Sequence, residues 1–186
     1  GLPKAATLTH HNIMNNGINI SEIIGFTSKD RVCLTVPFYH CFGMVLGSLA
    51  CLAGRSALIL PWPTFDAKKS LRAVEKWNCS TVYGVPTMFT EMVKAARVDH
   101  FDLKSLHKSI MGGSLCPQNL IQETQKHLGI SSVHVAYGMT ETSPISFMVR
   151  NEDESKKKIS TVGRILDHVE AQILSPEGLP VPIGKV

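Results

Sequence analysis

The sequence predicts an α/β fold in which a parallel sheet is flanked by helices and an antiparallel β lobe begins near the C-terminal end. Short apolar segments alternate with helical patterns between residues 9 and 138, as is typical of a parallel sheet covered on both faces. After residue 145, strand-like segments follow one another without a helical pattern between them, which indicates antiparallel pairing. With 186 residues, 44% of them apolar, the chain is long enough for one sizeable core or two small lobes.

The first predicted element is a helix that Thr9 caps, in which Ile13, Gly17, Ile20 and Ile24 recur at helical spacing. The next elements are a buried strand over residues 32–36, an apolar helix over 42–53 and a strand over 56–60.

Asp66 is placed to cap the following helix, in which Ala67, Leu71, Val74 and Trp77 share one face. The remaining elements of the alternating region are a strand over 81–84, a helix over 86–96 that Pro86 begins, a strand over 109–111, a helix over 117–128 that Gly129 ends, and a strand over 133–137. Beyond them, "ISFMV", "TVGRI" and "VEAQIL" are strand-like and "SPEGLPVPIG" is turn-rich. We therefore expect one subdomain over residues 1–144 and the start of a β-rich subdomain over 145–186.

Charge and composition argue against several classes of protein. The net charge is +4, and the basic cluster at residues 156–158 directly follows the acidic "NEDES", so a solvated loop is favoured over a nucleic-acid or lipid patch. Arg55 interrupts the most hydrophobic stretch, over residues 42–62, which argues against a membrane span. No signal or transit peptide is visible at the start of the sequence.

The cysteines and histidines show no metal-ligand spacing, which makes a zinc site unexpected. The cysteines form an odd set without a Cys-x-x-Cys pair, and we interpret them as reduced core thiols in a reducing compartment. They are Cys33, Cys41, Cys51, Cys79 and Cys116.

Four loops that carry polar groups each follow a predicted strand: "VPFYHCFG", "YGVPT", "MGGSLCP" and "YGMTETSP". Ligands of open α/β sheets bind beyond the carboxyl ends of the strands, so these loops are expected to form the rim of one pocket. Each has a plain structural explanation when taken alone: a glycine turn at 112–113, a half-buried His40, a surface or capping Glu141, and a core Tyr137. Their joint arrangement favours a binding site.

These motifs resemble those of the adenylate-forming (AMP-binding) superfamily. "YGMTETSP" is similar to its Tyr-Gly-x-Thr-Glu signature, and "GLPKAATLTHHN" to the end of its phosphate loop, with Ala5 where glycine is usual. "VPFYHCFG", "YGVPTMF", "MGGSLCP" and "STVGRILDHVEAQI" match in order and spacing. Within the superfamily the loops look most like fatty acyl-CoA synthetases, in particular the medium-chain type called acyl-CoA synthetase family member 2.

The resemblance implies a role for each matching residue. Glu141 would bind Mg²⁺, Thr140 would contact the α-phosphate, and Tyr137 would offer a flat face to adenine, with His40 near the reacting carboxylate. The other implied residues are Lys4 from the phosphate loop, Gly112, Gly113, Ser114, Gly138 and Met139 for the nucleotide, and Gly84, Val85 and Met111 for an acyl tunnel.

The function implied is ATP-dependent activation of a fatty acid to acyl-adenylate and then acyl-CoA, with ATP, Mg²⁺ and coenzyme A. A carboxylate is a poor nucleophile towards a polyanionic triphosphate, so a metal ion and donor groups must neutralise phosphate charge. The alternatives are an adenylation domain for another carboxylate, a luciferase-like enzyme, and a non-catalytic nucleotide- or lipid-binding module. We expect no nucleic-acid partner and an intracellular, by resemblance mitochondrial, location.

Two features of the resemblance concern completeness. The sequence starts within the phosphate loop, and it contains neither the family's Tyr-x-Thr-Gly-Asp motif nor a lid lysine. The chain is therefore expected to be a central fragment of a large N-terminal domain, without the lid domain, and to be inactive by itself.

Overall fold

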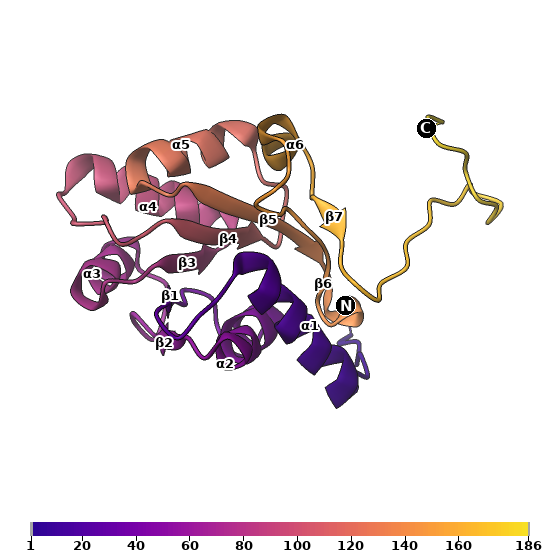
Figure 1. Ribbon diagram of the computed structural model, residues 1–186, viewed down its shortest axis with the longest axis horizontal. Coiled ribbons are helices and arrows are strands. Elements are labelled where there is room, and N and C mark those ends of the chain that lie inside the picture. The colour runs from indigo at the N-terminus through magenta and orange to yellow at the C-terminus, as the bar shows by residue number, and fades with distance from the viewer. Residues whose placement is uncertain (1, 186) are drawn as a thin grey trace.

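The computed structural model describes residues 2–185 and confirms the predicted parallel sheet. The strand order is β2-β1-β3-β4-β5-β6-β7; the first five strands are parallel, and β6 and β7 are antiparallel to their neighbours (Figure 1). The strands are β1 (Arg31–Cys33), β2 (Ala57–Ile59), β3 (Thr81–Gly84), β4 (Lys108–Gly112), β5 (Ser132–Gly138), β6 (Ile145–Met148) and β7 (Arg164–Ile165). In such an order, the direction in which strands are added reverses between β1 and β3, where α/β proteins commonly bind ligands.

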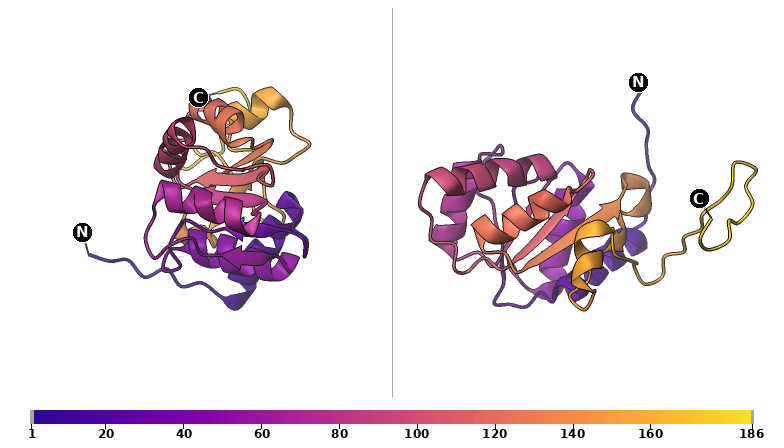
Figure 2. Two further views of the ribbon diagram at one scale, coloured as in Figure 1. Left: turned by 90° about the vertical axis from the view of Figure 1, so that its left-hand side faces the viewer. Right: turned by 90° about the horizontal axis from the view of Figure 1, so that it is seen from above.

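Helices cover both faces of the sheet, as the views from two sides show (Figures 1 and 2). One face carries α3 (Ala67–Trp77), α4 (Pro86–Val98) and α5 (Gln118–Leu128). The opposite face carries α1 (His10–Ile24), the π-helix η1 (Phe42–Leu49) and α2 (Ala50–Gly54), which continues η1.

The two faces bury separate apolar cores, because successive residues of a strand point to opposite sides. In β3, Val82 packs under α3 and α4, whereas its neighbour Tyr83 packs under α1 and η1. In β4, Met111 and Ile110 divide in the same way. This pattern confirms the expectation that the strands are buried on both faces.

The predicted helix boundaries follow from local chemistry that the structure confirms. The Thr9 hydroxyl accepts a hydrogen bond from the Asn12 amide at 3.1 Å, and the Asp66 carboxylate accepts one from the Lys69 amide at 2.9 Å. Gly129 ends α5 with φ of 72°, a left-handed conformation that glycine adopts without steric cost.

The apolar helix predicted over residues 42–53 exists, but its first part is a π-helix. Two glycines let this segment approach its neighbours closely. A methyl group at Gly43 would clash with the Pro37 carbonyl oxygen, and one at Gly47 would lie 2.9 Å from the Leu34 side chain. The π-helix therefore starts directly against the loop that follows β1.

A buried ion pair lies at the amino ends of β1 and β4, opposite these loops. The Lys108 ammonium lies 3.0 Å from a carboxylate oxygen of Asp30, and both side chains are largely buried. Asp30 also accepts hydrogen bonds from the Ser80 hydroxyl at 2.8 Å and from the Thr27 amide at 2.9 Å.

Several local expectations are wrong. The strand predicted over 32–36 ends at Cys33, because its partner β2 has only three residues. Trp77 is exposed rather than inward, since it occupies the last turn of α3 before Asn78 ends the helix in a left-handed conformation.

A further correction concerns the region after residue 145. A short helix, α6 (Ser155–Ser160), separates β6 from β7 and contains the three lysines that we expected in a loop. Its sequence lacks an apolar period, and it is held by a Glu154–Lys157 ion pair of 3.5 Å and by Lys158 donating to the Asn151 carbonyl at 2.6 Å. Lys156 and Lys157 are thus exposed and Lys158 is half-buried, and the charges of Lys157 and Lys158 are partly compensated.

The "VEAQIL" segment forms no strand. Its first residue, Val169, still packs against the core, and beyond it the chain runs away from the body of the molecule (Figure 1). Only an isolated bridge joins Leu174 to Pro180. β6 and β7 confirm antiparallel pairing at the C-terminal end and extend the same sheet, while a subdomain boundary at residue 144 stays a prediction. Among residues 2–185, no helix is both long and apolar enough to cross a membrane.

Candidate functional site

Two pockets lie side by side where β4 and β5 end, and they share three residues. Gly113, Ala136 and Gly138 line both of them. A methyl group at Gly112 would lie 2.7 Å from the Ala136 carbonyl oxygen, so the two strand ends touch through backbone at this point. The sequence predicts one pocket rim here, and the structure divides it into two.

The smaller pocket, of about 260 Å³, combines the loop after β1 with the loop after β5. It is lined by His40, Cys41, Phe42, Leu46, Gly112, Gly113, Ala136, Gly138, Met139, Thr140, Glu141, Pro144 and Ile145. Residues 40 and 141 are 101 positions apart in the chain, and the sheet brings them to one cavity. His40, Thr140 and Glu141 thus line one cavity, and the roles predicted for them stay predictions.

Two contacts set the chemistry of the wall that η1 begins. The Phe42 amide donates to His40 Nδ1 at 3.0 Å, so this ring nitrogen is an acceptor and any proton of the neutral ring is on Nε2. Cys41 Sγ lies 3.6 Å from Thr140 Oγ1 and 3.8 Å from His40 Nδ1. Cys41 thus joins the two loops across the pocket.

Thr140 and Glu141 project from η2 (Thr140–Thr142), a single 3-10 turn between β5 and β6. Gly138 is required before this turn, because a side chain there would clash with the Pro144 carbonyl oxygen. Both Thr140 and Glu141 are exposed, so a ligand entering the pocket meets a hydroxyl and a carboxylate directly.

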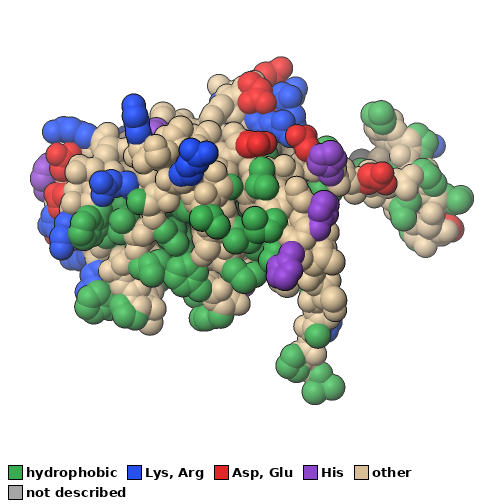
Figure 3. Space-filling view, turned by 60° about the horizontal axis from the view of Figure 1, so that its bottom comes forward, with side chains coloured by type: hydrophobic (Ala, Val, Ile, Leu, Met, Phe, Trp, Pro, Cys, Tyr) green, Lys and Arg blue, Asp and Glu red, His purple; other side chains and the backbone are tan. Residues whose placement is uncertain are grey.

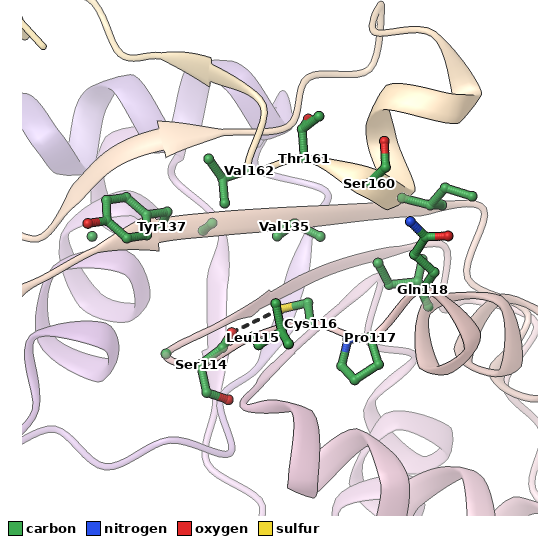
Figure 4. A pocket seen from close by; sticks show the side chains of 15 residues that line it. Ser114, Leu115, Cys116, Pro117, Gln118, Val135, Tyr137, Ser160, Thr161 and Val162 are labelled. Atoms are coloured by element: carbon green, nitrogen blue, oxygen red, sulfur yellow. Dashed lines mark hydrogen bonds between the residues drawn. The ribbon is translucent and has the colours of Figure 1, made fainter. Parts of the chain in front are cut away.

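The larger pocket, of about 640 Å³, lies on the other side of the β5 end, and Figure 4 shows its side chains. The Tyr137 ring, 47% exposed, stands at one end and meets Phe147 edge-on with ring centroids 6.1 Å apart. The other lining residues are Gly113, Ser114, Leu115, Cys116, Pro117, Gln118, Ile121, Val135, Ala136, Gly138, Ile159, Ser160, Thr161 and Val162. A flat aromatic face beside uncharged groups suits a neutral ring system such as a nucleobase.

Glu141 is the only acidic or basic side chain, histidine aside, among the residues that line the two pockets. One carboxylate beside a hydroxyl suits Mg²⁺, which keeps several waters and takes one or two protein carboxylates. Within residues 2–185 there is no cluster of three or more metal-ligating side chains.

The structure does not bring every predicted site residue to these pockets. Met111 is fully buried in the core under the α3–α5 helices, and Gly84 is buried at the end of β3. Val85 follows Gly84, and its Cγ1 would lie 3.2 Å from a methyl group at Gly113. Lys4 lies exposed in the segment before α1. The roles of these four residues stay predictions.

The prediction that all five cysteines are core thiols is wrong for two of them. Cys41 and Cys116 are half-exposed and line the smaller and the larger pocket, respectively. The sequence did offer a signal for these positions. Cys41 stands next to His40 and Cys116 follows Gly113, so both cysteines fall inside strand-end loops. Burial raises the pKa of the Cys116 thiol to about 11, so this side chain stays protonated at neutral pH.

The chain is similar to a large group of known proteins. A family model described as AMP-binding enzyme matches residues 1–186. The putative acyl-CoA synthetase YngI of Bacillus subtilis (strain 168) is 42% identical, with the match covering 95% of this chain and 32% of that protein. Medium-chain acyl-CoA ligase ACSF2, mitochondrial, of Danio rerio is 40% identical, covering 99% and 31%. The chain spans about a third of the length of the curated relatives it matches.

Solved structures share the fold. An ATP-bound RpMatB-BxBclM chimera is 26% identical with a TM-score of 0.86, covering 100% of this chain and 35% of that one. The long-chain-fatty-acid-CoA ligase FadD1 of Archaeoglobus fulgidus has a TM-score of 0.87 at 20% identity, covering 100% and 38%, and this likeness concerns the fold alone.

Proposed function

The chain belongs to the AMP-binding enzyme family, and from this membership we propose that it forms the nucleotide-binding part of an ATP-dependent fatty acid:CoA ligase. In that reaction a carboxylate attacks the α-phosphorus of ATP and pyrophosphate leaves. The thiol of coenzyme A then attacks the acyl-adenylate, and AMP leaves.

The observation that carries the proposal is the pair of adjoining pockets with different chemistry. One has a neutral, partly aromatic lining next to Tyr137, and the other gathers His40, Thr140 and Glu141. A nucleotide placed with its base against Tyr137 would pass the shared wall and bring its phosphates towards Thr140 and Glu141. The strand-end position of both pockets agrees with the general rule for open α/β sheets.

Each side chain has a role that follows from its chemistry. The Thr140 hydroxyl would donate to a phosphate oxygen, and Glu141 would hold Mg²⁺, which would supply positive charge to neutralise the phosphates. Gly112, Gly113, Ser114, Gly138 and Met139 provide the backbone and side-chain groups closest to the nucleotide. Because Nδ1 of His40 accepts a hydrogen bond from the Phe42 amide, Nε2 is the ring nitrogen that would contact the reacting carboxylate.

The apolar residues of the smaller pocket favour a fatty acid as the carboxylate. Phe42, Leu46 and Ile145 line it, and the only acid that faces it, Glu141, is assigned to the metal. An amino-acid substrate would instead need a carboxylate to hold its ammonium group. A medium-chain acid and a mitochondrial location are the finer part of the proposal, which the name of the Danio rerio relative supports.

The test grafts the 186 residues in place of the matching third of the Bacillus subtilis relative, so that a full-length protein can be assayed for ATP–pyrophosphate exchange. We expect exchange that depends on a fatty acid and not on amino acids. Glu141→Ala should lower exchange about a hundredfold or more, because it removes charge stabilisation from the transition state. The midpoint of thermal unfolding should stay unchanged, since Glu141 is exposed.

Glu91→Ala is the matched control, because Glu91 is an exposed carboxylate on α4 that only pairs with Lys94. Near-normal exchange in Glu141→Ala would contradict the assignment. Exchange driven by amino acids would favour a carrier-loading adenylation domain, and nucleotide binding without any exchange would favour a binding module.

A further inference from the structure

The hydroxyl of Thr142 lies at the centre of the turn that carries Thr140 and Glu141. It accepts a hydrogen bond from the Met139 amide at 3.1 Å and lies 2.6 Å from the Pro144 carbonyl oxygen. It is also 3.0 Å from the Met139 carbonyl oxygen. Thr142 stands directly after the Tyr-Gly-x-Thr-Glu motif, and neither the motif nor the proposed chemistry assigns it a role.

A hydroxyl has one hydrogen, so it can donate to only one of these two carbonyls at a time. The Pro144 carbonyl is the nearer, at 2.6 Å against 3.0 Å. The same carbonyl accepts a hydrogen bond from the Met139 amide at 3.0 Å. Thr142 therefore ties the start of the turn to the start of β6, and the carboxyl end of β5 is held against Pro144 at the same point.

The side chains that would meet the nucleotide have little other support. Among residues 2–185, Glu141 makes no hydrogen bond or ion pair, and the only polar contact of the Thr140 hydroxyl is with Cys41 Sγ at 3.6 Å. Their placement thus depends on the backbone of η2. Two backbone bonds close this turn, from the Thr142 amide to the Met139 carbonyl at 2.9 Å and from the Ser143 amide to the Thr140 carbonyl at 3.2 Å.

We propose that Thr142 is a positioning residue that fixes the η2 turn, so that Thr140 and Glu141 face the phosphates and the metal ion. The inference rests on the proposed function for its ligand and on the hydrogen bonds of the turn for its geometry. Thr142 itself does not line either pocket.

The test compares Thr142→Val, which keeps the shape of the side chain but removes the hydroxyl, with Thr142→Ser, which keeps the hydroxyl. Thr90→Val is the matched control, because the Thr90 hydroxyl donates to the Pro86 carbonyl at 3.1 Å within α4, away from both pockets. Three quantities are measured on the 186-residue chain: hydrogen exchange of the Met139, Thr142 and Ser143 amides, the dissociation constant of Mg-ATP, and the midpoint of thermal unfolding.

We expect Thr142→Val to speed exchange of these three amides about tenfold and to weaken Mg-ATP binding by a similar factor, as for the loss of one to two hydrogen bonds. Thr142→Ser should restore both values, and Thr90→Val should change neither. The midpoint of thermal unfolding should be the same for Thr142→Val and Thr90→Val.

The outcomes separate this inference from the proposed function. Unchanged amide exchange in Thr142→Val, or failure of Thr142→Ser to restore it, would overturn the positioning role whether or not ATP binds. Faster exchange without any Mg-ATP binding to the unsubstituted chain would support Thr142 as the residue that fixes the turn and would count against the nucleotide assignment. Faster exchange with unchanged Mg-ATP affinity would show that the turn does not position the ligand-binding groups, and this too would overturn the inference.

Discussion

Asp30 is a buried carboxylate whose charge is balanced by several donors. Burial by itself raises its pKa, but hydrogen bonds from Lys108, Ser80 and Thr27 outweigh this effect and hold the pKa below its ordinary value. The carboxylate therefore stabilises the fold above the pKa it has in the unfolded chain, and this contribution is lost as the pH falls through its lower folded pKa.

Replacing Asp30 by asparagine should lower the free energy of unfolding by about 3 kcal/mol, because Lys108 would be left as a buried, unpaired charge. Urea unfolding at neutral pH measures this loss. The control is Glu91→Gln, which breaks the exposed ion pair with Lys94 and should cost less than about 0.5 kcal/mol. Equal effects of the two substitutions would contradict the buried-pair interpretation.

His134 is a buried histidine that should make stability depend on pH. Burial lowers its pKa, and this outweighs the opposing effect of its hydrogen bond to the Val149 carbonyl, at 2.8 Å from Nδ1. At low pH the unfolded chain therefore binds a proton that the folded chain does not. The free energy of unfolding should decrease as the pH falls below about 6.5, the usual value for the unfolded side chain.

Urea unfolding at a series of pH values between 8 and 5 checks this expectation, and the decrease should be smaller in His134→Asn. The pKa of His127 is also lowered, by desolvation and by the charges of Arg97 and Lys126, but this residue lies at the surface of α5. His127→Asn should therefore retain most of the decrease. If only His127→Asn abolished the pH dependence of the free energy of unfolding, the surface residue His127 and not His134 would be its source.

At the level of single residues, the sequence predicted which side chains gather but not what holds them. Thr140, Glu141 and His40 were identifiable because each follows a strand in a motif of polar residues. The contact between Cys41 and Thr140 joins residues 99 positions apart, and no local pattern encodes it. The hydrogen bond between His134 and the Val149 carbonyl was equally hidden, although a strand covered on both faces predicts that the His134 side chain is buried.

The π-helix η1 is the element whose form the sequence did not predict. Its apolar composition indicated a buried helix, which is correct, but α and π forms share the same residues and differ by one hydrogen-bond register. In this segment Gly43 lies close to the Pro37 carbonyl and Gly47 close to the Leu34 side chain, and no local sequence pattern encodes these tertiary contacts. The sequence did not predict helix α6 at all, because its charged residues form no apolar stripe.

Gly43→Ala should be destabilising because the added methyl group meets the fixed carbonyl of Pro37. We expect a loss of about 1 to 3 kcal/mol in the free energy of unfolding, as for overpacking of a core. Because Phe42 and Leu46 of the same helix line the smaller pocket, binding of Mg-ATP and a fatty acid should weaken as well.

Gly25→Ala is the control for Gly43→Ala, and the free energy of unfolding of both proteins is measured by urea titration. Gly25 ends α1 with φ of 67° and has no atom within 4 Å of the added methyl group. It should show only the strain of a left-handed residue, about 1 to 2 kcal/mol, and no effect on ligand binding. A Gly43→Ala protein that binds as the unsubstituted chain does would argue against contact between η1 and the site.

On the scale of the whole molecule, hydrophobic side chains are exposed on the face that carries α1 and α2. Figure 3 shows such side chains gathered across the lower part of the face turned towards the viewer. A hollow between α1 and α2 is lined by Met14, Ile18, Leu49 and Leu52, and Leu52 is 69% exposed. Exposed apolar surface of this kind promotes association.

We therefore expect the 186-residue chain to self-associate with increasing concentration, which sedimentation velocity measures directly. Leu52→Glu should reduce the association, because it places a charge in the apolar hollow. Leu115→Glu is the control, since Leu115 is also exposed but lies at the larger pocket. Association that is unchanged in Leu52→Glu would place the contact surface elsewhere.

The fold as a whole was predictable because the alternation of strands and helices fixes a parallel sheet with covered faces. The division of the site into two pockets was not, since it depends on how closely the ends of β4 and β5 approach.

The close approach of β4 and β5 also determines which residues of the two pockets can be substituted. The wall between the pockets consists of Gly113, Ala136 and Gly138, which offer almost no side chain to vary. Substitutions at Leu46 or Phe42 reshape one pocket, and substitutions at Gln118 or Ser114 reshape the other. We therefore expect that the shape of either pocket can be changed without the other, provided that the three wall residues are left untouched.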